Sequence, residues 1–379
     1  MDDCDFQHLR RAIRLAMNGR GAVEPNPMVG CVIVKDGQAI GEAYHAQFGG
    51  PHAEPQALAA CATSPEGATA YVTLEPCCHT NKKTPPCVPK LIEAKLARVV
   101  IGTLDPNPEV NGKGVAMLRA AGIQVDGPAL EDEARQLNAA FIKGTLHQRP
   151  YVTVKWAQSA DGKVAGPGGQ RVWISNRAAF RAVHQIRARS DVILVGINTA
   201  LADDPLLSAR GVEPLRTLRR AVLDSNLRLP PESQLVRTAA GEVTVFCSRD
   251  TFRKSPKVDE LQSLGIEIIP IKADPNGVGL SLDDVLFDLD NVATHVLVEA
   301  GPTLARSFIE QNFVDRVWII RSPNPISDPS APEAVKLAYP AVGTVDLEGD
   351  VLTEYLNPHS RAFFAPLPSA DLVLISRSR

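Results

Sequence analysis

The sequence predicts two consecutive α/β domains in a chain of 379 residues. Short apolar segments typical of buried strands alternate with segments of helical spacing, which is the pattern of sheets covered by helices. Cysteine content separates the halves, because six of the seven cysteines precede residue 90. A polar stretch that ends at Pro150 interrupts the alternation, so we expect domains over residues 1–147 and 148–379.

The expected first domain begins with a helix over 6–17, where apolar residues recur near helical spacing. Residues 29–34 form a continuous apolar run typical of a buried strand, and Asp36-Gly37 is a typical hairpin turn. The same reasoning predicts helices at 57–62 and 88–94, strands at 70–74 and 98–101, and two closing segments at 115–121 and 130–141.

The expected second domain opens with the alternating apolar and polar residues of 151–156, which predict a strand. Its other strands are predicted at 191–196, 220–224, 242–247, 266–271, 295–299 and 316–321, with helices at 177–188 and 304–311.

Composition excludes several classes of protein. Apolar residues make up 44% of the chain and charged residues 22%, so a folded globular protein is expected rather than a disordered one. The net charge of −3 argues against a dedicated binder of nucleic acid or membrane surfaces. No apolar run approaches the length of about 18 residues that a membrane span needs. The acidic N-terminal residues differ from a secretion signal, so we expect a cytoplasmic protein whose cysteines are thiols or metal ligands.

The first domain carries a candidate zinc site. His52 is followed, after the predicted strand at 70–74, by Cys77 and then Cys87. A catalytic zinc ion takes three protein ligands and keeps one position for water, and one imidazole with two thiolates meets that count. Glu54 lies two residues from the histidine, which places it beside the metal as an acid–base group. The pattern predicts one zinc ion per chain and a hydrolytic deaminase.

A structural metal site is the alternative for the same residues. Cys77, Cys78, His79 and Cys87 would supply the four ligands of a closed zinc site without catalytic function.

The order His-Ala-Glu, strand, Pro-Cys resembles the cytidine-deaminase-like superfamily, whose signature is H-x-E followed by P-C-x-x-C. The second cysteine arrives only at Cys87, and the stretches PNPMVGCVIV (25–34) and DPNPEVNGKG (105–114) accompany it. Together these features resemble the deaminase domain of the RibD family of bifunctional riboflavin-biosynthesis proteins. The loop from Cys77 to Cys87 is one residue longer than the commonest family spacing, so Cys78 stays an alternative ligand to Cys77.

The resemblance implies a small-molecule substrate, a diaminopyrimidinone that carries a phosphoribosylamino group, whose 2-amino group is hydrolysed. The positions that match the family's pocket offer amide and carboxylate groups for the base and cationic groups for the phosphate. They are Asn26, His45, His79, Lys83, Asp105 and Asn107. The longer loop leaves Lys82 as an alternative to Lys83.

The second domain has no Gly-x-Gly-x-x-Gly motif between a strand and a helix. It does contain a predicted buried strand, a small-residue loop at Gly301 and a predicted helix, and the start of such a helix suits a phosphate. With the segments 155–163, 173–175, 196–205 and 223–225, this loop resembles the RibD reductase domain. That resemblance implies a dihydrofolate-reductase-like fold that takes NADPH and delivers a hydride to C1 of the sugar.

The same resemblance assigns two groups of residues. Those implied in NADPH binding are Ala157, Trp173, Thr199, Asp203, Ser225, Gly301, Pro302, Thr303, Leu304, Ala305, Arg306 and Ser307. Those implied in binding the reductase substrate are Arg171, Arg187, Leu207, Arg210 and Glu299. Arginine suits the sugar phosphate, because its guanidinium group pairs with two phosphate oxygens.

Three departures from the family pattern bear on the reductase. Arg171 stands where the family has a serine, residues 322–328 replace a Pro-Lys-Leu-Leu-Gly-like stretch, and the sequence from 330 onward matches poorly. A deaminase with a degenerate, reductase-like binding domain is therefore the main alternative to a bifunctional enzyme. A deaminase acting on nucleic acid is a further alternative, against which the charge argues. The family resemblance also implies a homodimer.

Overall fold

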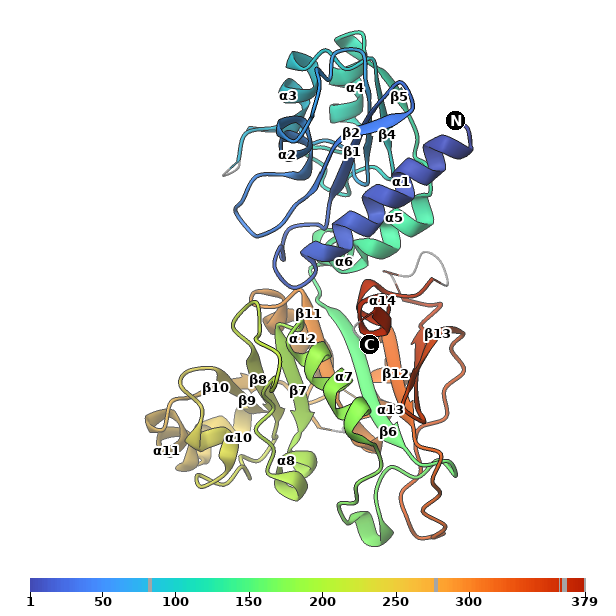
Figure 1. Cartoon of the computed structure of the whole chain (residues 1–379). Helices are drawn as coiled ribbons and strands as arrows, with labels where there is room; N and C mark the ends of the chain where they lie inside the picture. Colours follow the sequence, from blue (N-terminus) through green and yellow to red (C-terminus); the bar gives the residue numbers. More distant parts are fainter. Residues whose placement is uncertain (81–83, 276–278, 361, 363–366, 378–379) are drawn as a thin grey trace. The chain divides into compact units, whose positions relative to one another are not determined.

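The structure is a computed structural model, and it describes residues 1–80, 84–275, 279–360, 362 and 367–377 (Figure 1). The predicted pocket residue Lys83 and its alternative Lys82 therefore lie outside the described residues. The chain divides into two compact units, Met1–His147 and Gln148–Arg379. Each unit has its own sheet and core, and each is considered by itself.

The first unit is built on a five-stranded sheet in the order β2-β1-β3-β4-β5. Strand β1 pairs antiparallel with β2 and β3, whereas β3, β4 and β5 are parallel. The turn between β1 and β2 is formed by Asp36 and Gly37, both with positive φ, as a tight hairpin turn requires. The strands are β1 (Gly30–Lys35), β2 (Gln38–Tyr44), β3 (Thr69–Val72), β4 (Arg98–Ile101) and β5 (Gln124–Asp126).

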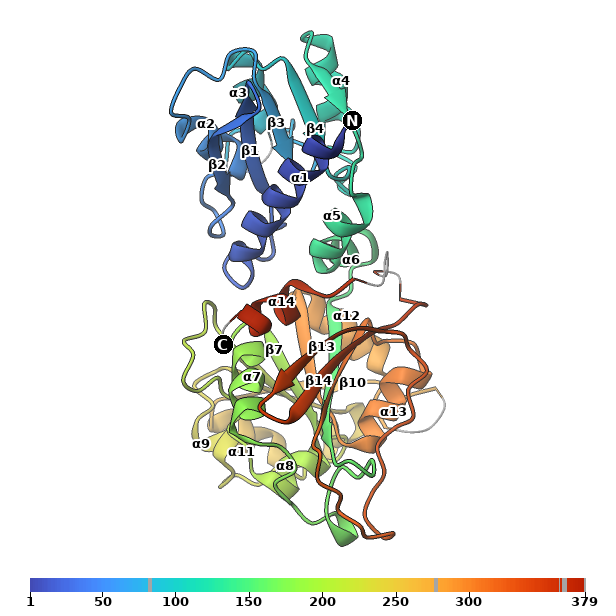
Figure 2. The ribbon, with the colours of Figure 1, turned by 45° about the vertical axis from the view of Figure 1, so that its right-hand side comes forward.

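Helices cover both faces of this sheet (Figure 2). Side chains alternate along β1, so Cys31 and Ile33 pack into one core and Val32 and Val34 into the other. Helices α2, α3 and α4 contribute to the first core, and α1 contributes to the second. The helices are α1 (Asp3–Ala16), α2 (Ala53–Ala59), α3 (Cys87–Glu93), α4 (Lys113–Ala120), α5 (Glu131–Leu137) and α6 (Ala139–His147).

The second unit is built on a nine-stranded sheet in the order β10-β9-β8-β7-β11-β6-β12-β14-β13. The seven strands from β10 to β12 are parallel, and β14 and β13 extend the sheet as an antiparallel hairpin (Figure 2). The parallel strands are β6 (Tyr151–Gln158), β7 (Val192–Gly196), β8 (Arg219–Leu223), β9 (Val243–Ser248), β10 (Ile266–Ile271), β11 (His295–Glu299) and β12 (Arg316–Arg321). The hairpin strands are β13 (Ala341–Leu347) and β14 (Asp350–Leu356).

Two hydrophobic cores lie on the two faces of this second sheet. One includes apolar residues of α7, α9, α11 and α14, and the other includes residues of α12 and α13. The helices are α7 (Arg177–Arg187), α8 (Ile197–Asp203), α9 (Gln234–Arg237), α10 (Arg249–Lys254), α11 (Lys257–Ser263), α12 (Leu282–Asp290), α13 (Pro302–Glu310) and α14 (Ala370–Arg377). None of the helices in the described part of the chain combines the length and apolar character that crossing a membrane requires.

The structure corrects two of the predicted elements. The helix predicted at 57–62 begins earlier, at Ala53, because His52 serves as its N-cap. The closing segment 130–141 is divided into α5 and α6, and Asn138 lies between them with its side chain bonded to the backbone of Met28 at 2.8 and 2.9 Å. Asparagine is suited to such a break because its side chain competes with helical hydrogen bonds.

Candidate metal centre and cofactor cavity

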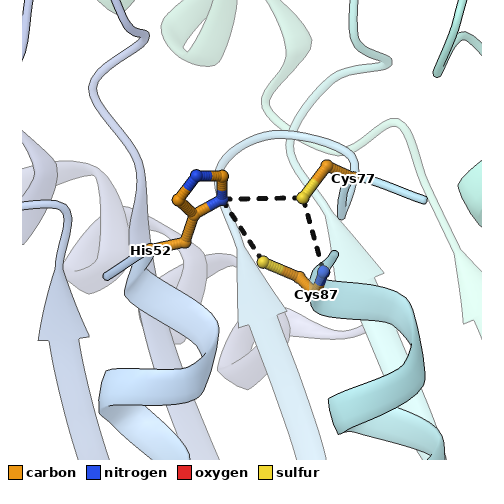
Figure 3. A group of neighbouring side chains, drawn as sticks. All are labelled: His52, Cys77 and Cys87. Carbon is orange, nitrogen blue, oxygen red and sulfur yellow. Dashed lines mark hydrogen bonds between the residues drawn. The ribbon is translucent and has the colours of Figure 1, made fainter. Parts of the chain in front are cut away.

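Three side chains from separate elements converge at one end of the first sheet. His52 caps α2, Cys77 lies in the loop after β3, and Cys87 is the first residue of α3. Their ligand atoms, Nδ1 of the histidine and Sγ of both cysteines, lie within 4.8 Å of one another. Figure 3 shows the imidazole nitrogen directed at both sulfur atoms, at 3.5 Å from Cys77 and 3.4 Å from Cys87.

These separations fit a tetrahedral zinc ion. With Zn–S and Zn–N bonds of the usual length, tetrahedral angles place nitrogen and sulfur about 3.6 Å apart. The observed 3.5 and 3.4 Å are close to that value, and an imidazole with two thiols is a donor set that zinc prefers. Among the described residues the cluster contains Cys77 and not Cys78, whose Sγ instead lies 3.8 Å from the carbonyl oxygen of Glu109.

Neighbouring groups fix the orientation of the three ligands. The backbone N–H of Cys87 donates to the carbonyl oxygen of Cys77 at 3.0 Å and approaches its Sγ at 3.4 Å. Thr84 Oγ1 lies 3.0 Å from Nε2 of His52. A hydrogen bond at Nε2 leaves Nδ1 as the nitrogen that faces the two sulfur atoms, which is how outer residues select the metal-binding tautomer.

Glu54 lies beside the cluster on the first turn of α2. The residue is 3% exposed, and Oε2 has no hydrogen-bond partner among the described residues. Burial raises the pKa of this carboxyl, and the nearby Cys77 adds to the rise. A buried carboxylate oxygen without a partner is costly, so its position next to three metal-binding side chains makes Glu54 the candidate acid–base group of this site.

Two predicted pocket residues adjoin the metal ligands. The His45 ring lies edge-on to that of His52 with centroids 5.3 Å apart, and its Nδ1 donates to the carbonyl oxygen of Pro51 at 3.0 Å. Asn26 Nδ2 therefore donates to the remaining nitrogen, Nε2, at 3.3 Å. Burial lowers the pKa of His45, which favours the neutral ring that can accept from the Asn26 amide.

The other predicted pocket residues belong to two loops. Asp105 and Asn107 lie after β4, where Asp105 Oδ1 accepts from the Asn107 backbone at 2.9 Å and Asn107 Oδ1 accepts from Glu109 at 3.0 Å. His79 follows the cysteine pair, and its buried Nδ1 has no partner among the described residues. The loop of Asp105 and Asn107 contacts the cysteine pair that precedes His79, since Cys78 Sγ lies 3.8 Å from the carbonyl oxygen of Glu109.

The second unit contains a cavity of about 760 Å³. Its walls include residues of β6, β7 and β11 and of helices α7 and α8, and its volume lies in the usual range for sites of small molecules and cofactors. Eleven of the residues predicted for the reductase line it. They are Ala157, Trp173, Thr199, Asp203, Gly301, Pro302, Arg171, Arg187, Leu207, Arg210 and Glu299.

The remaining predicted NADPH residues do not line this cavity. They are Ser225, Thr303, Leu304, Ala305, Arg306 and Ser307. Five of them, residues 303–307, belong to helix α13, and only the N-terminal end of this helix reaches the cavity. Ala305 is 2% exposed and packs in the hydrophobic core, and the Ser307 hydroxyl donates back to the carbonyl oxygen of Thr303 at 3.1 Å.

Arg187 and Glu299 form a paired salt bridge inside the cavity. The guanidinium Nε and Nη2 donate to the two carboxylate oxygens at 2.5 and 2.8 Å, and Nη1 donates to the carbonyl oxygen of Ser208. Burial alone would raise the pKa of Glu299, but Arg187 outweighs it and lowers that pKa to about 2. Lys155, a cavity residue absent from the predicted set, sits opposite Glu299 on β6, and burial lowers its pKa.

Arg210 and Arg171 are the more accessible cations of the cavity. The Arg210 guanidinium lies 5.3 Å from the ring centre of Phe180 and has no carboxylate partner among the described residues. Arg171, the departure from the family pattern, stacks 5.3 Å from the ring centre of Trp173 and lies 3.6 Å from Asp203. The guanidinium group of Arg171 therefore contacts two of the predicted NADPH residues, Trp173 and Asp203.

His184 is a second cavity residue that the sequence did not single out. It is 1% exposed, and its Nδ1 accepts the backbone N–H of Arg210 at 2.9 Å. Burial, with Arg187 and Arg210 nearby, lowers its pKa from 6.5 to about 4, although Glu299 opposes the shift. In the sequence, only the position of His184 on the buried face of α7 could have indicated that it lines the cavity.

We expect His184 to make the second unit less stable in mild acid. Between pH 6.5 and 4 the unfolded chain binds a proton here that the folded protein does not, so the free energy of unfolding falls as the pH is lowered. Urea unfolding at several pH values checks this through tryptophan fluorescence, because all three tryptophans lie beyond residue 150. His184→Asn keeps an acceptor for Arg210 without the titration. Equal pH slopes for both proteins would contradict the expectation.

The fold and the two sites define a class of protein: a zinc-dependent deaminase domain joined to a nucleotide-binding α/β reductase domain. Comparison with known proteins agrees with this class. The family described as cytidine and deoxycytidylate deaminase zinc-binding region matches residues 2–103, and the RibD C-terminal domain matches residues 150–333.

Whole-chain relatives identify the family. Riboflavin biosynthesis protein RibD of Aquifex aeolicus is 38% identical over 85% of this chain and 87% of its own, and that of Escherichia coli is 39% identical over 84% and 88%. The Acinetobacter baumannii RibD structure matches with a TM-score of 0.80 at 35% identity, covering 93% of this chain and 98% of its own. The chain therefore belongs to the RibD family.

A Thermotoga maritima structure adds a description of activity. It is described as a diaminohydroxyphosphoribosylaminopyrimidine deaminase/5-amino-6-(5-phosphoribosylamino)uracil reductase, and it matches with a TM-score of 0.79 at 33% identity over 93% of this chain and 98% of its own. The predicted fold class is confirmed, and the protein is a bifunctional enzyme with a zinc-dependent deaminase and an NADPH-dependent reductase. The alternative of a degenerate second domain is not favoured.

Proposed function

We propose that this chain carries out two consecutive reactions of riboflavin biosynthesis. The first replaces the 2-amino group of 2,5-diamino-6-(5-phosphoribosylamino)pyrimidin-4(3H)-one with oxygen from water and releases ammonia. The second reduces the ribosyl side chain of the product, 5-amino-6-(5-phosphoribosylamino)uracil, to ribityl. The His52, Cys77 and Cys87 cluster with the buried Glu54 beside it is the observation that carries the first reaction.

The deaminase residues have distinct roles in this proposal. His52, Cys77 and Cys87 would hold zinc, which when bound supplies Lewis acidity that lowers the pKa of water. Glu54 Oε2 takes a proton from the attacking water and passes it to the departing amine, since it is free of other partners. The substrate is bound by Asn26, His45, His79, Lys83, Asp105 and Asn107.

The reductase residues bind and orient two ligands. NADPH supplies the hydride that reaches C1 of the sugar. The cavity residues Ala157, Trp173, Thr199, Asp203, Gly301 and Pro302 support its placement there. Ser225 and residues 303–307 lie outside the cavity lining and belong to the proposed set through the family resemblance alone. Glu299 and Arg187, which hold each other ionised in the cavity wall, are proposed to bind the substrate together with Arg171, Leu207 and Arg210.

The proposal is tested with purified protein given the diaminopyrimidine substrate and NADPH. We expect ammonia release and NADPH oxidation in the same tube. A chelator that removes zinc should abolish ammonia release, while NADPH oxidation continues when the deaminated intermediate is supplied directly. Absence of ammonia release from a zinc-loaded, folded sample would contradict the first reaction.

Arg210→Ala should raise the KM of the reductase substrate roughly 10- to 100-fold, because one charged hydrogen-bonding partner of the sugar phosphate is lost. Stability should change little, since Arg210 has no ion-pair partner among the described residues. NADPH oxidation kinetics measure the effect, and a dephosphorylated substrate is the control that should not distinguish the variant from the unmodified protein. An equal loss with both substrates would assign Arg210 another role.

We further propose the domain limits 1–147 for the deaminase and 148–379 for the reductase. The two compact units and the residues matched by the two families support these limits. Likeness to the RibD family supports a homodimer and a cytoplasmic location. Light scattering of the purified protein tests the dimer, for which a monomer mass would be the contrary result.

A further inference from the structure

A buried carboxylate close to the metal centre is not used by the mechanism above. Glu75 lies two residues before Cys77 and is 2% exposed. Both of its carboxylate oxygens accept backbone N–H groups: Oε2 from Asp105 at 3.3 Å and Gly112 at 2.9 Å, and Oε1 from Val115 at 3.1 Å. A buried carboxyl group that accepts from three backbone donors is firmly fixed in place.

Two of the donors, Asp105 and Gly112, lie on a single loop, and the third, Val115, lies in the first turn of the helix α4 that follows it. Asp105 opens the loop that carries the proposed substrate residues, and Gly112 closes it at the N-cap of α4. Gly112 has no side chain to cap this helix, so Glu75 bonds the free N–H of Val115 in the way a capping side chain would. One carboxylate thus ties the start and the end of the loop to the segment that bears a metal ligand.

Close packing enforces the same arrangement. A Cβ atom at Gly114 would lie 2.3 Å from the carbonyl oxygen of Pro76 and 3.1 Å from Glu75 Oε1. Only glycine lets α4 approach the Glu75–Pro76 segment this closely. The backbone of Glu75 adds a further bond, because its N–H donates to the carbonyl oxygen of Thr103 at 2.9 Å.

We propose that Glu75 is a positioning residue for the deamination reaction. It fixes the position of the loop of Asp105 and Asn107 relative to the metal ligand Cys77. A pyrimidine bound by this loop is therefore held in the correct position beside the metal centre and Glu54. This inference rests on the proposed function, because it assigns substrate contacts to that loop. A residue that acts through the loop should affect substrate binding more than the chemical step.

Glu75→Gln tests the proposal with little change in shape. Its amide NH₂ group would face a backbone N–H and leave at least one donor unpaired. We expect the KM for deamination to rise roughly tenfold, with kcat changed less than about threefold. Zinc content and the reductase rate of the same chain should stay as in the unmodified protein.

The matched control is Asp5→Asn, a buried carboxylate of the same unit bonded to Arg98 and Tyr71. This variant should lose stability without any change in KM. Hydrogen exchange should quicken in residues 105–115 of Glu75→Gln but not in β1. The double variant Glu75→Gln/Asp105→Asn should have a KM no higher than that of the single variant with the higher KM, since both residues act through one loop.

Gly114→Ala provides an independent route if Glu75→Gln does not fold, because it displaces α4 while leaving Glu75 intact. It should reproduce the rise in KM. An unchanged KM in either folded variant, additive effects with Asp105→Asn, or loss of zinc from Glu75→Gln would each overturn the inference. Ammonia release by the unmodified protein shows that such a failure concerns Glu75 alone, whereas its absence would overturn the proposed function and this inference together.

Discussion

Glu54→Gln should lower kcat for deamination by roughly 10²- to 10⁴-fold, the range that positioned acid–base groups contribute. The amide is close in shape to the carboxyl but cannot accept and return a proton. Because Oε2 has no other partner among the described residues, the loss should be chemical rather than structural. Ammonia release under saturating substrate measures the effect.

Two further measurements show whether the loss of rate in Glu54→Gln is due to proton transfer alone. Zinc content and NADPH oxidation with the deaminated intermediate should be unchanged in Glu54→Gln. Glu93→Gln makes the same substitution at an exposed position of α3 and should keep the full rate. Deamination by Glu54→Gln at the rate of the unmodified protein would remove this residue from the mechanism.

Arg316→Met should reduce the free energy of unfolding of the second unit by about 3–5 kcal/mol, because it removes the cation that two buried carboxyl groups contact. The Arg316 side chain is 7% exposed on β12 and bridges Glu354 at 3.0 Å and Asp371 at 3.3 Å, which are themselves 0% and 7% exposed. These contacts connect β12 with β14 and the C-terminal helix α14. Urea unfolding followed by tryptophan fluorescence measures the change.

Arg181→Met is the matched control for that experiment. Its partner Glu348 is on the same unit, but the two side chains are 62% and 69% exposed, and such pairs contribute at most about 1 kcal/mol. Replacing Glu354 and Asp371 together with Arg316 by apolar residues should recover much of the lost stability. Equal losses in Arg316→Met and Arg181→Met would show that the buried cluster does not stabilise the fold.

The sequence was most informative where chemistry demands particular residue types. Three parallel strands were predicted at the observed residues, 266–271, 295–299 and 316–321, because each is a short segment rich in β-branched residues. The residues grouped at the metal centre were predicted because few side chains bind zinc and their order along the chain is distinctive. In both cases the signal is local and depends on side-chain type.

Features that depend on backbone or on distant partners were not predicted. The bonds of Glu75 join it to main-chain groups 30 to 40 residues further along, and any residue type can supply a backbone N–H. The β13–β14 hairpin was missed because its turn contains Glu348, an unusual residue at positive φ, in place of the common Asn or Asp. The orientation of residues 303–307 depends on how α13 packs, which a matching motif does not reveal.

The place of β11 in the second sheet has a consequence for synthesis of the protein on the ribosome. This strand lies between β6 and β7, although it follows both of them by about a hundred residues or more along the chain. The first unit is complete at residue 147, whereas the central gap of the second sheet closes only after residue 299 has been added. At usual elongation rates this interval is on the order of ten seconds. During that time the nascent chain exposes two unpaired strand edges, so we expect chaperones to be needed most at this stage.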